Sequence, residues 1–358
     1  MSQANPIPTE SYAALATGEK LVPHSIERRQ TGLRDVQIDI DFCGVCHTDL
    51  HLVNNDWGMS VYPLVPGHEI IGRVSAVGSA VNDLNVGQRV GVGCLVDSCQ
   101  QCSSCERGEE QYCLNGMTMT YGSPTEDPGG ITFGGYSKMI TVNRDFVLKV
   151  PETLDPSACA PLLCAGITTY SPLRHWKVGP GMTVGVIGLG GLGHMGIKLA
   201  HAMGARVIMI TTSASKAEDA KRLGAEDVLL STDSAAMDAA TGQFDFLLNT
   251  IPVPHDFNHY MMLLKIDGTM CVVGAIGPLA ELNTMPLIMG RRSVSGSLIG
   301  GLSETQEMLD FCGEKDITAD VELIDIGQID DAYERMLKSD VKYRFVIDLA
   351  TLGAAAAV

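Results

Sequence analysis

The sequence predicts an α/β plus β protein with two domains, one rich in β-strands and one with a doubly wound parallel sheet. The chain has 358 residues, a length that suits about two domains. Up to about residue 150 it contains short Val-rich segments broken by Gly, and in 35–42 Val36, Ile38, Ile40 and Phe42 alternate with polar residues, as in a half-buried strand. From about residue 157, apolar strands alternate with amphipathic helices, which is typical of βαβ units.

The elements follow in order along the chain. After the strand at 35–42 we expect β-structure at 70–81 and 87–96, and then an irregular stretch at 94–130 rich in Cys, Gly, Ser and Pro. The α/β part contains a helix at 192–204, ended by Gly204, another at 215–224, and strands at 182–188, 206–212, 227–231, 244–250 and 268–274.

Two helices, each followed by a short strand, complete the chain. They occupy 303–312, 319–324, 328–337 and 344–349, and they are too few for a third domain. We expect them to rejoin the first domain, so the predicted domains are 1–157 with 303–358, and 158–302. Ser303 is the expected N-cap of the first helix, with Gln306 in the capping-box position.

The charge and the cysteine content narrow the possible functions. A net charge of −17 argues against nucleic acid and anionic membranes as partners, because both favour a basic surface. The first ten residues contain no basic segment followed by an apolar one, so we expect a cytoplasmic protein. In that reducing compartment, 11 cysteines indicate metal binding or catalysis more than disulfides.

A glycine motif marks a dinucleotide site. Gly188, Gly190 and Gly193 form G-x-G-x-x-G between a strand and a helix, so that the backbone at Gly190 can approach a pyrophosphate at the helix N-terminus. Gly191 and Leu192, which follow in the same loop, are expected to contact the cofactor as well. The acidic residue that binds the ribose of NAD is missing at the end of the next strand. The hydroxyls and ammonium found there instead suit a 2′-phosphate and favour NADP; they belong to Thr211, Thr212, Ser213 and Lys216.

Two cysteine patterns suggest metal sites. Cys99, Cys102, Cys105 and Cys113 are spaced as in a closed four-cysteine zinc site, although an iron–sulfur cluster could use similar spacing. The segment 43–47 reads C-x-x-C-H, which resembles a haem attachment site or a redox dithiol, but export is needed for haem attachment in bacteria. Alternatively, one cysteine of this segment belongs to a dispersed metal site of the Cys–His–Cys type that catalytic zinc uses; its members would be Cys46, His68 and Cys164, with Glu69 adjacent.

Five ordered motifs resemble the zinc-dependent medium-chain alcohol dehydrogenases. They are CGVCHTDLH, GHEIIGRVSAVGSAV, the Cys99–Cys113 segment, LLCAGITTY and GLGGLG. Within that superfamily the chain looks most like the cinnamyl-alcohol-dehydrogenase group, particularly its bacterial NADP-dependent aldehyde reductases. The resemblance implies a GroES-like catalytic domain with a structural zinc lobe at about 94–116, a Rossmann domain, NADP(H), and two zinc ions per chain, one catalytic and one structural.

The resemblance also implies roles for individual residues. Catalytic zinc would be held by Cys46, His68 and Cys164, with Glu69 as an alternating ligand and Asp49 orienting His68. Thr48 would pass the substrate proton to His51, which could otherwise be a surface histidine. Further cofactor contacts would come from Thr168, Thr250, Gly274, Leu298, Ile299 and Gly300. Trp57 and Met119 would line the substrate pocket, although Trp57 could equally be a core aromatic.

The implied activity is hydride transfer between NADPH and an aldehyde/primary alcohol pair, mainly reduction of aromatic or medium-chain aldehydes by a homodimer. Two rivals are an enone or quinone reductase of the same superfamily, which lacks the zinc ligands, and a zinc-binding thiol sensor that uses Cys43 and Cys46. Two departures from the plant pattern stand out: Lys216 is followed by Ala217 at the 2′-phosphate site, and the loop 116–133 differs.

Overall fold

The computed structural model describes residues 5–274, 277–278 and 281–353, and it divides into two compact units. The discontinuous unit comprises Met1–Cys164 and Gly300–Val358, and the central unit comprises Ala165–Ile299. The boundaries expected from sequence were 157/158 and 302/303. Among the described residues, no helix has the length and apolarity needed to cross a membrane.

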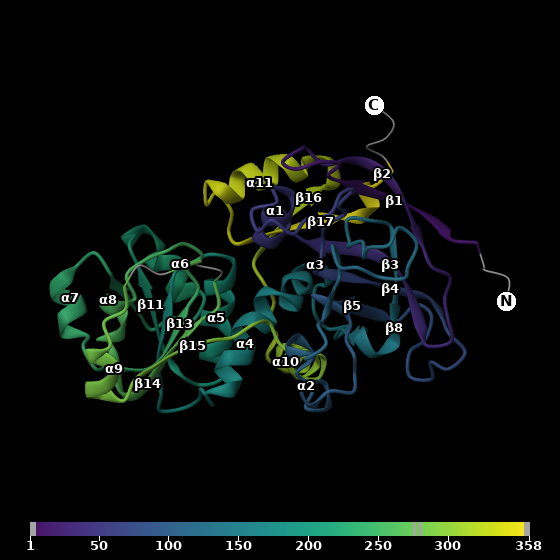
Figure 1. Cartoon of the computed structure of the whole chain (residues 1–358). Coiled ribbons are helices and arrows are strands. Elements are labelled where there is room, and N and C mark those ends of the chain that lie inside the picture. Colours follow the sequence, from purple (N-terminus) through teal and green to yellow (C-terminus); the bar gives the residue numbers. More distant parts are fainter. Residues whose placement is uncertain (1–4, 275–276, 279–280, 354–358) are drawn as a thin grey trace. The chain divides into compact units, whose positions relative to one another are not determined.

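The discontinuous unit is built on a seven-stranded sheet in the order β16-β17-β3-β4-β5-β9, with β8 also paired to β3 (Figure 1). Its pairs are antiparallel, except that β16 and β17 are parallel. The C-terminal strands thus join the first part of the chain through the pairing of β17 with β3. The strands are β3 (Asp35–Gly44), β4 (Ile70–Val77), β5 (Arg89–Val92), β8 (Met139–Asn143), β9 (Leu148–Lys149), β16 (Val321–Asp325) and β17 (Arg344–Asp348).

The end of β3 prepares the functional site. Val36, Ile38 and Ile40 are buried, as the alternating pattern predicts, whereas Phe42 is only half-buried and Cys43 is fully buried. The cause is a register shift between Ile40 and Phe42 in the pairing with β4. After this shift the odd-numbered position Cys43, and no longer the even-numbered Phe42, faces the core. The chain therefore reaches the end of β3 with Cys43 directed into the core.

Smaller elements surround this sheet. A hairpin of β1 (Ile7–Ala13) and β2 (Val22–Arg28) was not expected from sequence. The stretch expected to be irregular contains β6 (Leu95–Asp97) paired with β7 (Thr118–Met119). The helices are α1 (His47–Val53), α2 (Ser103–Glu106), α3 (Pro156–Cys159), α10 (Leu302–Lys315) and α11 (Ile329–Leu337), with single 3-10 turns at Glu110–Tyr112, Arg144–Phe146, Ala160–Leu163, Ile326–Gln328 and Leu349–Thr351.

The expected capping box at Ser303 and Gln306 is wrong. The N-cap of α10 is Gly301, without a side-chain cap of its own. The carboxylate of Glu110 accepts a hydrogen bond from the Leu302 N–H at 2.9 Å instead, so a distant residue satisfies the first turn. Gln306 bonds to the Lys149 backbone, accepting from its N–H at 2.8 Å and donating to its carbonyl at 2.9 Å.

The central unit has a six-stranded sheet in the order β12-β11-β10-β13-β14-β15, all parallel, which is the Rossmann order (Figure 1). The order reverses between β10 and β13, and ligands bind at the carboxyl ends of strands at such a point. The strands are β10 (Thr183–Ile187), β11 (Arg206–Thr211), β12 (Asp227–Leu230), β13 (Phe244–Asn249), β14 (Leu264–Val272) and β15 (Ser293–Gly296). The helices are α4 (Ala165–His175), α5 (Gly191–Ala202), α6 (Ala217–Arg222), α7 (Ser234–Ala239), α8 (Phe257–Met261) and α9 (Met285–Gly290), with a 3-10 turn at Ala214–Lys216.

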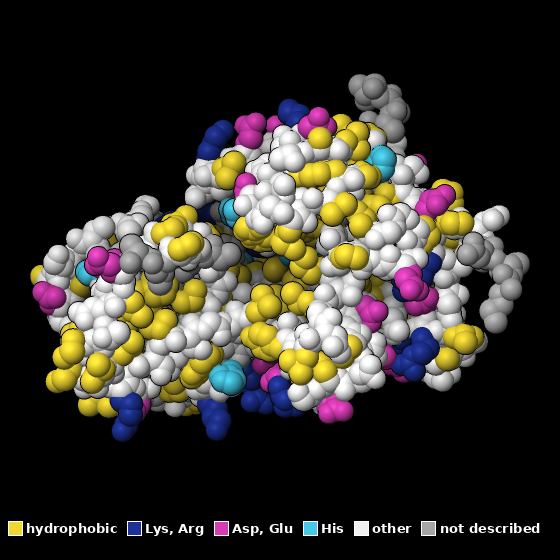
Figure 2. Space-filling view, viewed as in Figure 1, with side chains coloured by type: hydrophobic (Ala, Val, Ile, Leu, Met, Phe, Trp, Pro, Cys, Tyr) yellow, Lys and Arg dark blue, Asp and Glu magenta, His cyan; other side chains and the backbone are white. Residues whose placement is uncertain are grey.

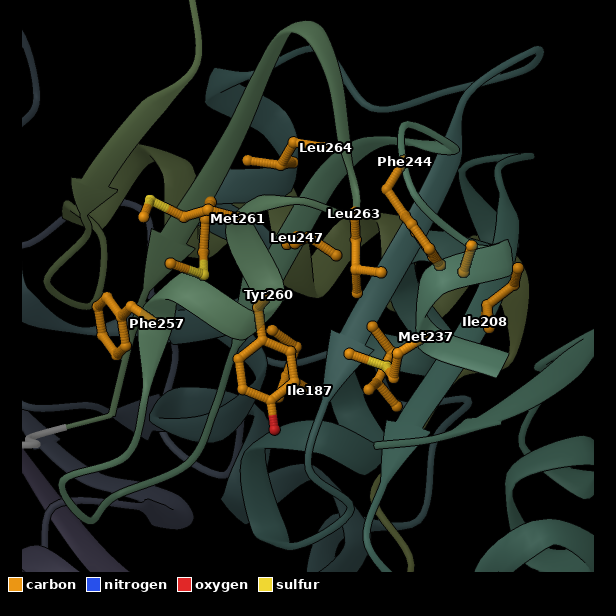
Figure 3. Close-up of a cluster of buried hydrophobic side chains, with 13 residues drawn as sticks. Ile187, Ile208, Met237, Phe244, Leu247, Phe257, Tyr260, Met261, Leu263 and Leu264 are labelled. Atoms are coloured by element: carbon orange, nitrogen blue, oxygen red, sulfur yellow. The ribbon is translucent and has the colours of Figure 1, made fainter. Parts of the chain in front are cut away.

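One buried cluster of the central unit holds several of these elements together. Phe244 and Leu247 of β13 pack with Tyr260 and Met261 of α8 and with Met237 of α7 (Figure 3). All five side chains are at most 8% exposed, so the sheet is covered by apolar side chains at this point. Ile187, the last residue of β10, belongs to the same cluster, so this packing holds the strand end that precedes the predicted glycine loop.

Candidate active site

The turn from β3 into α1 presents Cys46. β3 ends at Gly44, and Cys46 is the N-cap residue of α1. The Asp49 carboxylate folds back and accepts a hydrogen bond from the Cys46 N–H at 2.8 Å. Gly44 is required at the turn because a β-carbon there would overlap the Glu69 carboxylate. The local sequence thus fixes the position of the Cys46 thiol at the start of the helix.

Four buried side chains meet at this turn, and all of them were expected there. Ligand atoms of Cys46, His68, Glu69 and Cys164 lie within 4.8 Å of one another, and the sulfurs of Cys46 and Cys164 are 3.9 Å apart. His68 and Glu69 directly precede β4, and Cys164 follows the 3-10 turn after α3. Two thiols and an imidazole, with a carboxylate beside them, are the donor set of catalytic zinc.

Glu69 is held by a residue that sequence reasoning missed. Arg344, the first residue of β17, donates a hydrogen bond to Glu69 Oε1, and both side chains are buried. Within the described residues, Glu69 Oε2 is buried and has no hydrogen-bond partner. A buried carboxylate oxygen of this kind is costly unless it gains a partner, and a bound cation at the site would supply one. The site therefore fits a metal ion.

The electrostatics of the cluster distinguish the two cysteines of the C-x-x-C pair. The hydrogen bond from Cys164 is the main reason that the pKa of the Cys46 thiol lies well below its usual value. Burial raises the pKa of Glu69 to about 8, against the opposing effect of Arg344. Burial likewise raises the pKa of Cys43 well above its usual value, so Cys43 is a poor nucleophile. Only the second cysteine of the C-x-x-C pair has the environment of a ligand.

Asp49 lies behind His68. Its Oδ1 is 3.4 Å from His68 Nδ1, which leaves Nε2 as the ring nitrogen available to a metal. Metal-binding histidines generally use a carboxylate in this way to fix the ring and its tautomer. The expected relation between Asp49 and His68 is thus present as a contact in the structure.

The residues expected to carry the proton lie along α1. Thr48 Oγ1 is 3.6 Å from the Cys46 sulfur. One turn further on, His51 Nδ1 is 2.7 Å from Asp56 Oδ2, a partner that was not anticipated. The Trp57 ring lies 5.2 Å from the His51 ring between centroids, and at 45% exposure it is not a core aromatic. Met119 is half-buried in β7.

The four remaining predicted ligands form a second cluster. Cys99, Cys102, Cys105 and Cys113 have their sulfurs within 4.8 Å of one another. Backbone N–H groups of Cys99 and Leu114 point at the sulfurs of Cys113 and Cys102, each at 3.4 Å. The backbone N–H groups of Cys105 and Leu114 lower the pKa of Cys102 to about 6, which favours a thiolate. Four thiols in this geometry fit a closed structural zinc site.

In the central unit, the predicted glycine loop connects β10 to α5. Gly188 has a φ of +93°, and a β-carbon on Gly193 would overlap the Gly188 carbonyl oxygen. A β-carbon on Gly190 would meet nothing within 4 Å, so the backbone is open to a ligand there. Lys216 donates from Nζ to the Leu189 carbonyl at 3.0 Å, which brings its ammonium to the loop.

The other predicted cofactor residues lie in the central unit, except Gly300. Thr211 is the last residue of β11, followed by Thr212 and by Ser213, whose hydroxyl is 2.8 Å from that of Ser215. Thr250 donates to the Ile187 carbonyl at 2.8 Å, directly behind the loop. Gly191 and Leu192 begin α5, and Thr168 is buried in α4. Gly274 lies against Ile251. Leu298 and Ile299 end the central unit, and Gly300 begins the last segment of the other unit.

A β unit with two cysteine-rich metal sites, joined in one chain to a Rossmann unit, is the architecture of a zinc-containing dehydrogenase. Residues 32–152 match the alcohol dehydrogenase GroES-like domain, and residues 191–314 match the zinc-binding dehydrogenase domain. The chain is 55% identical to the aldehyde reductase YahK of Escherichia coli over 96% of its length and 99% of that protein. It is 50% identical to the NADP-dependent alcohol dehydrogenase C of Mycobacterium tuberculosis over 96% and 99% of the two chains.

Two solved structures share the whole fold. The cinnamyl alcohol dehydrogenase of Sorghum bicolor has a TM-score of 0.92 at 44% identity, with 96% of this chain and 98% of that chain covered. The CAD of Helicobacter pylori, complexed with NADP(H), has a TM-score of 0.89 at 38% identity, with 97% and 99% covered. This chain belongs to the zinc-dependent medium-chain alcohol dehydrogenases, a family of alcohol and aldehyde oxidoreductases.

Proposed function

We propose that this chain reduces aldehydes to primary alcohols with NADPH as the hydride donor, and that its substrates are aromatic or medium-chain aldehydes. The observation that carries the proposal is the buried Cys46–His68–Cys164 cluster at the N-terminus of the helix that also holds Thr48 and His51. The family and the names of its relatives support the reaction class, because aldehyde reductases and NADP-dependent alcohol dehydrogenases are among them.

The residues of the cluster fit zinc, which when bound polarises a carbonyl oxygen as a Lewis acid. Cys46, His68 and Cys164 would hold the ion, and Asp49 would keep the His68 ring in its working orientation. Thr48 would supply the proton that the product alkoxide needs. His51 would supply the proton that replaces the one given up by Thr48, and Asp56 would fix the His51 tautomer.

The preference for NADPH rests on the loop and the end of β11. The carboxyl end of β11 offers hydroxyls and the Lys216 ammonium, where an enzyme selective for NAD would carry an acidic side chain. The Lys216 ammonium already lies at the glycine loop through its contact with Leu189. A 2′-phosphate would find a charged donor at this position.

The rivals are less well supported. An enone or quinone reductase of this superfamily would lack the cluster of Cys46, His68 and Cys164. A thiol sensor would require an oxidisable Cys43, but that side chain is fully buried and its pKa is raised by burial. Both arguments favour an enzyme that uses the metal site.

A panel of aldehydes and alcohols, each measured as kcat/KM with NADPH and NADH, tests the proposal. We expect aromatic and medium-chain aldehydes with NADPH to give the highest values. Cys46→Ser should abolish turnover, while Cys43→Ser should retain it because Cys43 lies outside the ligand cluster. A much better rate with NADH would refute the cofactor assignment, and full activity of Cys46→Ser would refute the metal mechanism.

We further propose a cytoplasmic homodimer formed through the edge of the central sheet at which, among the described residues, β15 lies. β15 is the last strand in that sheet, and α9 exposes Met285, Ile288 and Met289 at 55%, 70% and 76%. Figure 2 shows apolar side chains gathered over the α9 and β14 part of the central unit. An exposed apolar surface beside an unpaired edge commonly marks an interface. Light scattering should give a dimer for the wild type and a monomer for Ile288→Glu, with Leu323→Glu as an exposed control in β16.

A further inference from the structure

The carboxylate of Asp49 is surrounded by hydrogen-bond donors, and two of them have no role in the function proposed above. Asp49 is fully buried. Its Oδ1 receives the Gly67 N–H at 3.2 Å and lies 3.4 Å from His68 Nδ1, and its Oδ2 receives the Cys46 N–H at 2.8 Å. The remaining donors are the hydroxyl groups of Tyr121 and Tyr136, one on each carboxylate oxygen.

Tyr121 contacts the histidine side of the site in two ways. Its hydroxyl donates to Asp49 Oδ1 at 2.6 Å, the same oxygen that faces His68. Its ring is stacked on the His68 ring, with centroids 5.7 Å apart and planes 21° apart. One buried side chain therefore restrains both the imidazole and the carboxylate that orients it.

Tyr136 holds the other side of the carboxylate. Its hydroxyl donates to Asp49 Oδ2 at 3.3 Å, and its ring is fully buried against Gly67, the residue before His68. Tyr121 follows β7 and Tyr136 precedes β8, so both hydroxyls reach Asp49 from a segment separate from α1. The two bonds prevent the carboxylate from rotating about its side-chain torsion.

We propose that Tyr121 and Tyr136 are positioning residues for the metal-binding His68 and act on it through the carboxylate of Asp49. The proposal rests on metal binding at Cys46, His68 and Cys164, as proposed above. Both hydroxyls donate to Asp49. Their effect comes from the number of donors: a carboxylate that accepts from both sides keeps one orientation, and His68 then keeps its ring and tautomer for the metal.

Replacing tyrosine by phenylalanine isolates the hydroxyl, because the ring and its packing remain. The variants are Tyr121→Phe and Tyr136→Phe. The control is Tyr260→Phe, whose ring is buried in the central unit core (Figure 3). The full-length proteins are loaded with zinc, and the release of each metal to a chelator is followed by the colour change of the chelator. In parallel, cobalt-substituted proteins are examined by visible spectroscopy, since the bands report the ligand field at the site.

We expect Tyr121→Phe to weaken metal binding at the Cys46–His68–Cys164 site about tenfold, the lower end of effects seen for such outer partners, and therefore to release the metal faster. The cobalt bands should shift at the same time. Tyr136→Phe should change both readouts in the same direction but less, because its hydrogen bond is longer. Release from the four-cysteine site and both readouts of Tyr260→Phe should match the wild type.

Wild-type cobalt bands and release rates in both site variants would overturn the inference while leaving the proposed function intact. A wild-type protein that holds metal only at the four-cysteine site would overturn the proposed function and the inference together. If one variant fails to fold, as judged by urea unfolding, the other decides the question, since each hydroxyl contacts a different oxygen of Asp49.

Discussion

Replacing Lys216 by alanine should change cofactor preference without changing the chemistry. The Lys216 ammonium donates to the Leu189 carbonyl at 3.0 Å in a partly buried position, so it is held at the glycine loop and not free in solvent. A hydrogen bond between this ammonium and a 2′-phosphate would contribute about 1.5–3 kcal/mol, and partial exposure of the ammonium places that contact at the lower end. Since about 1.4 kcal/mol is a factor of ten, Lys216→Ala should lower kcat/KM for NADPH about tenfold.

The assay compares kcat/KM for NADPH and NADH at a saturating aldehyde concentration. The value with NADH should stay close to that of the wild type, because NADH lacks the 2′-phosphate and so loses no contact with Lys216. Lys221→Ala is the matched control, since Lys221 is an exposed lysine in the last turn of α6. Equal losses with both cofactors, or no loss with NADPH, would show that Lys216 does not read the phosphate.

Three other changes probe the glycine loop, a helix cap and the structural metal. Gly193→Ala should weaken NADPH binding more than tenfold and destabilise the central unit by about 1–3 kcal/mol, because its β-carbon would overlap the Gly188 carbonyl; a fluorescence titration and urea unfolding measure the two effects. Asp155→Ala should cost about 1 kcal/mol at pH 7 by removing the N-cap of α3. The hydrogen bond from Ser157 lowers the pKa of Asp155. The stabilisation by Asp155 is therefore present above the ordinary carboxyl pKa and is lost as the pH falls through the lower folded-state pKa. The difference in unfolding free energy between wild type and Asp155→Ala should thus shrink from pH 7 to pH values below about 4. Cys105→Ser should release one zinc per chain, measured by metal analysis, and lower Tm, while wild-type zinc content in this variant would exclude the four-cysteine site.

Sequence reasoning succeeded where the signal is local. The strands and helices of the central unit recur at short spacing, and their period distinguishes them, so the doubly wound parallel sheet could be predicted. The hairpin of β1 and β2 was not predicted because two polar residues, Thr9 and Ser11, occupy buried positions in β1 and obscure the alternation of apolar and polar residues. Helix α4 was not predicted because it is buried on nearly every side, so it has no amphipathic stripe, and because it contains Pro172.

In the functional site, too, the residues that belong to local motifs were predicted and their distant partners were not. The ligand types and their order could be read from motifs, but the partners that hold them are distant in sequence. Arg344 is 275 residues from Glu69, and Tyr121 is 72 residues from Asp49. Asp56 is only five residues from His51, yet nothing in the spacing alone distinguishes a binding carboxylate from a solvated one. Contacts of this kind depend on the packed fold.

The late pairing of β17 with β3 sets an order of events during synthesis. The central unit is one continuous segment, so every residue of its sheet has been made when the chain reaches Ile299. The seven-stranded sheet, by contrast, lacks β16 and β17 until the last residues emerge. Domains generally fold as units as the chain is made. The central unit can therefore be complete before Arg344 has been synthesised and can pair with Glu69. The metal site is therefore among the last parts of the molecule to be finished.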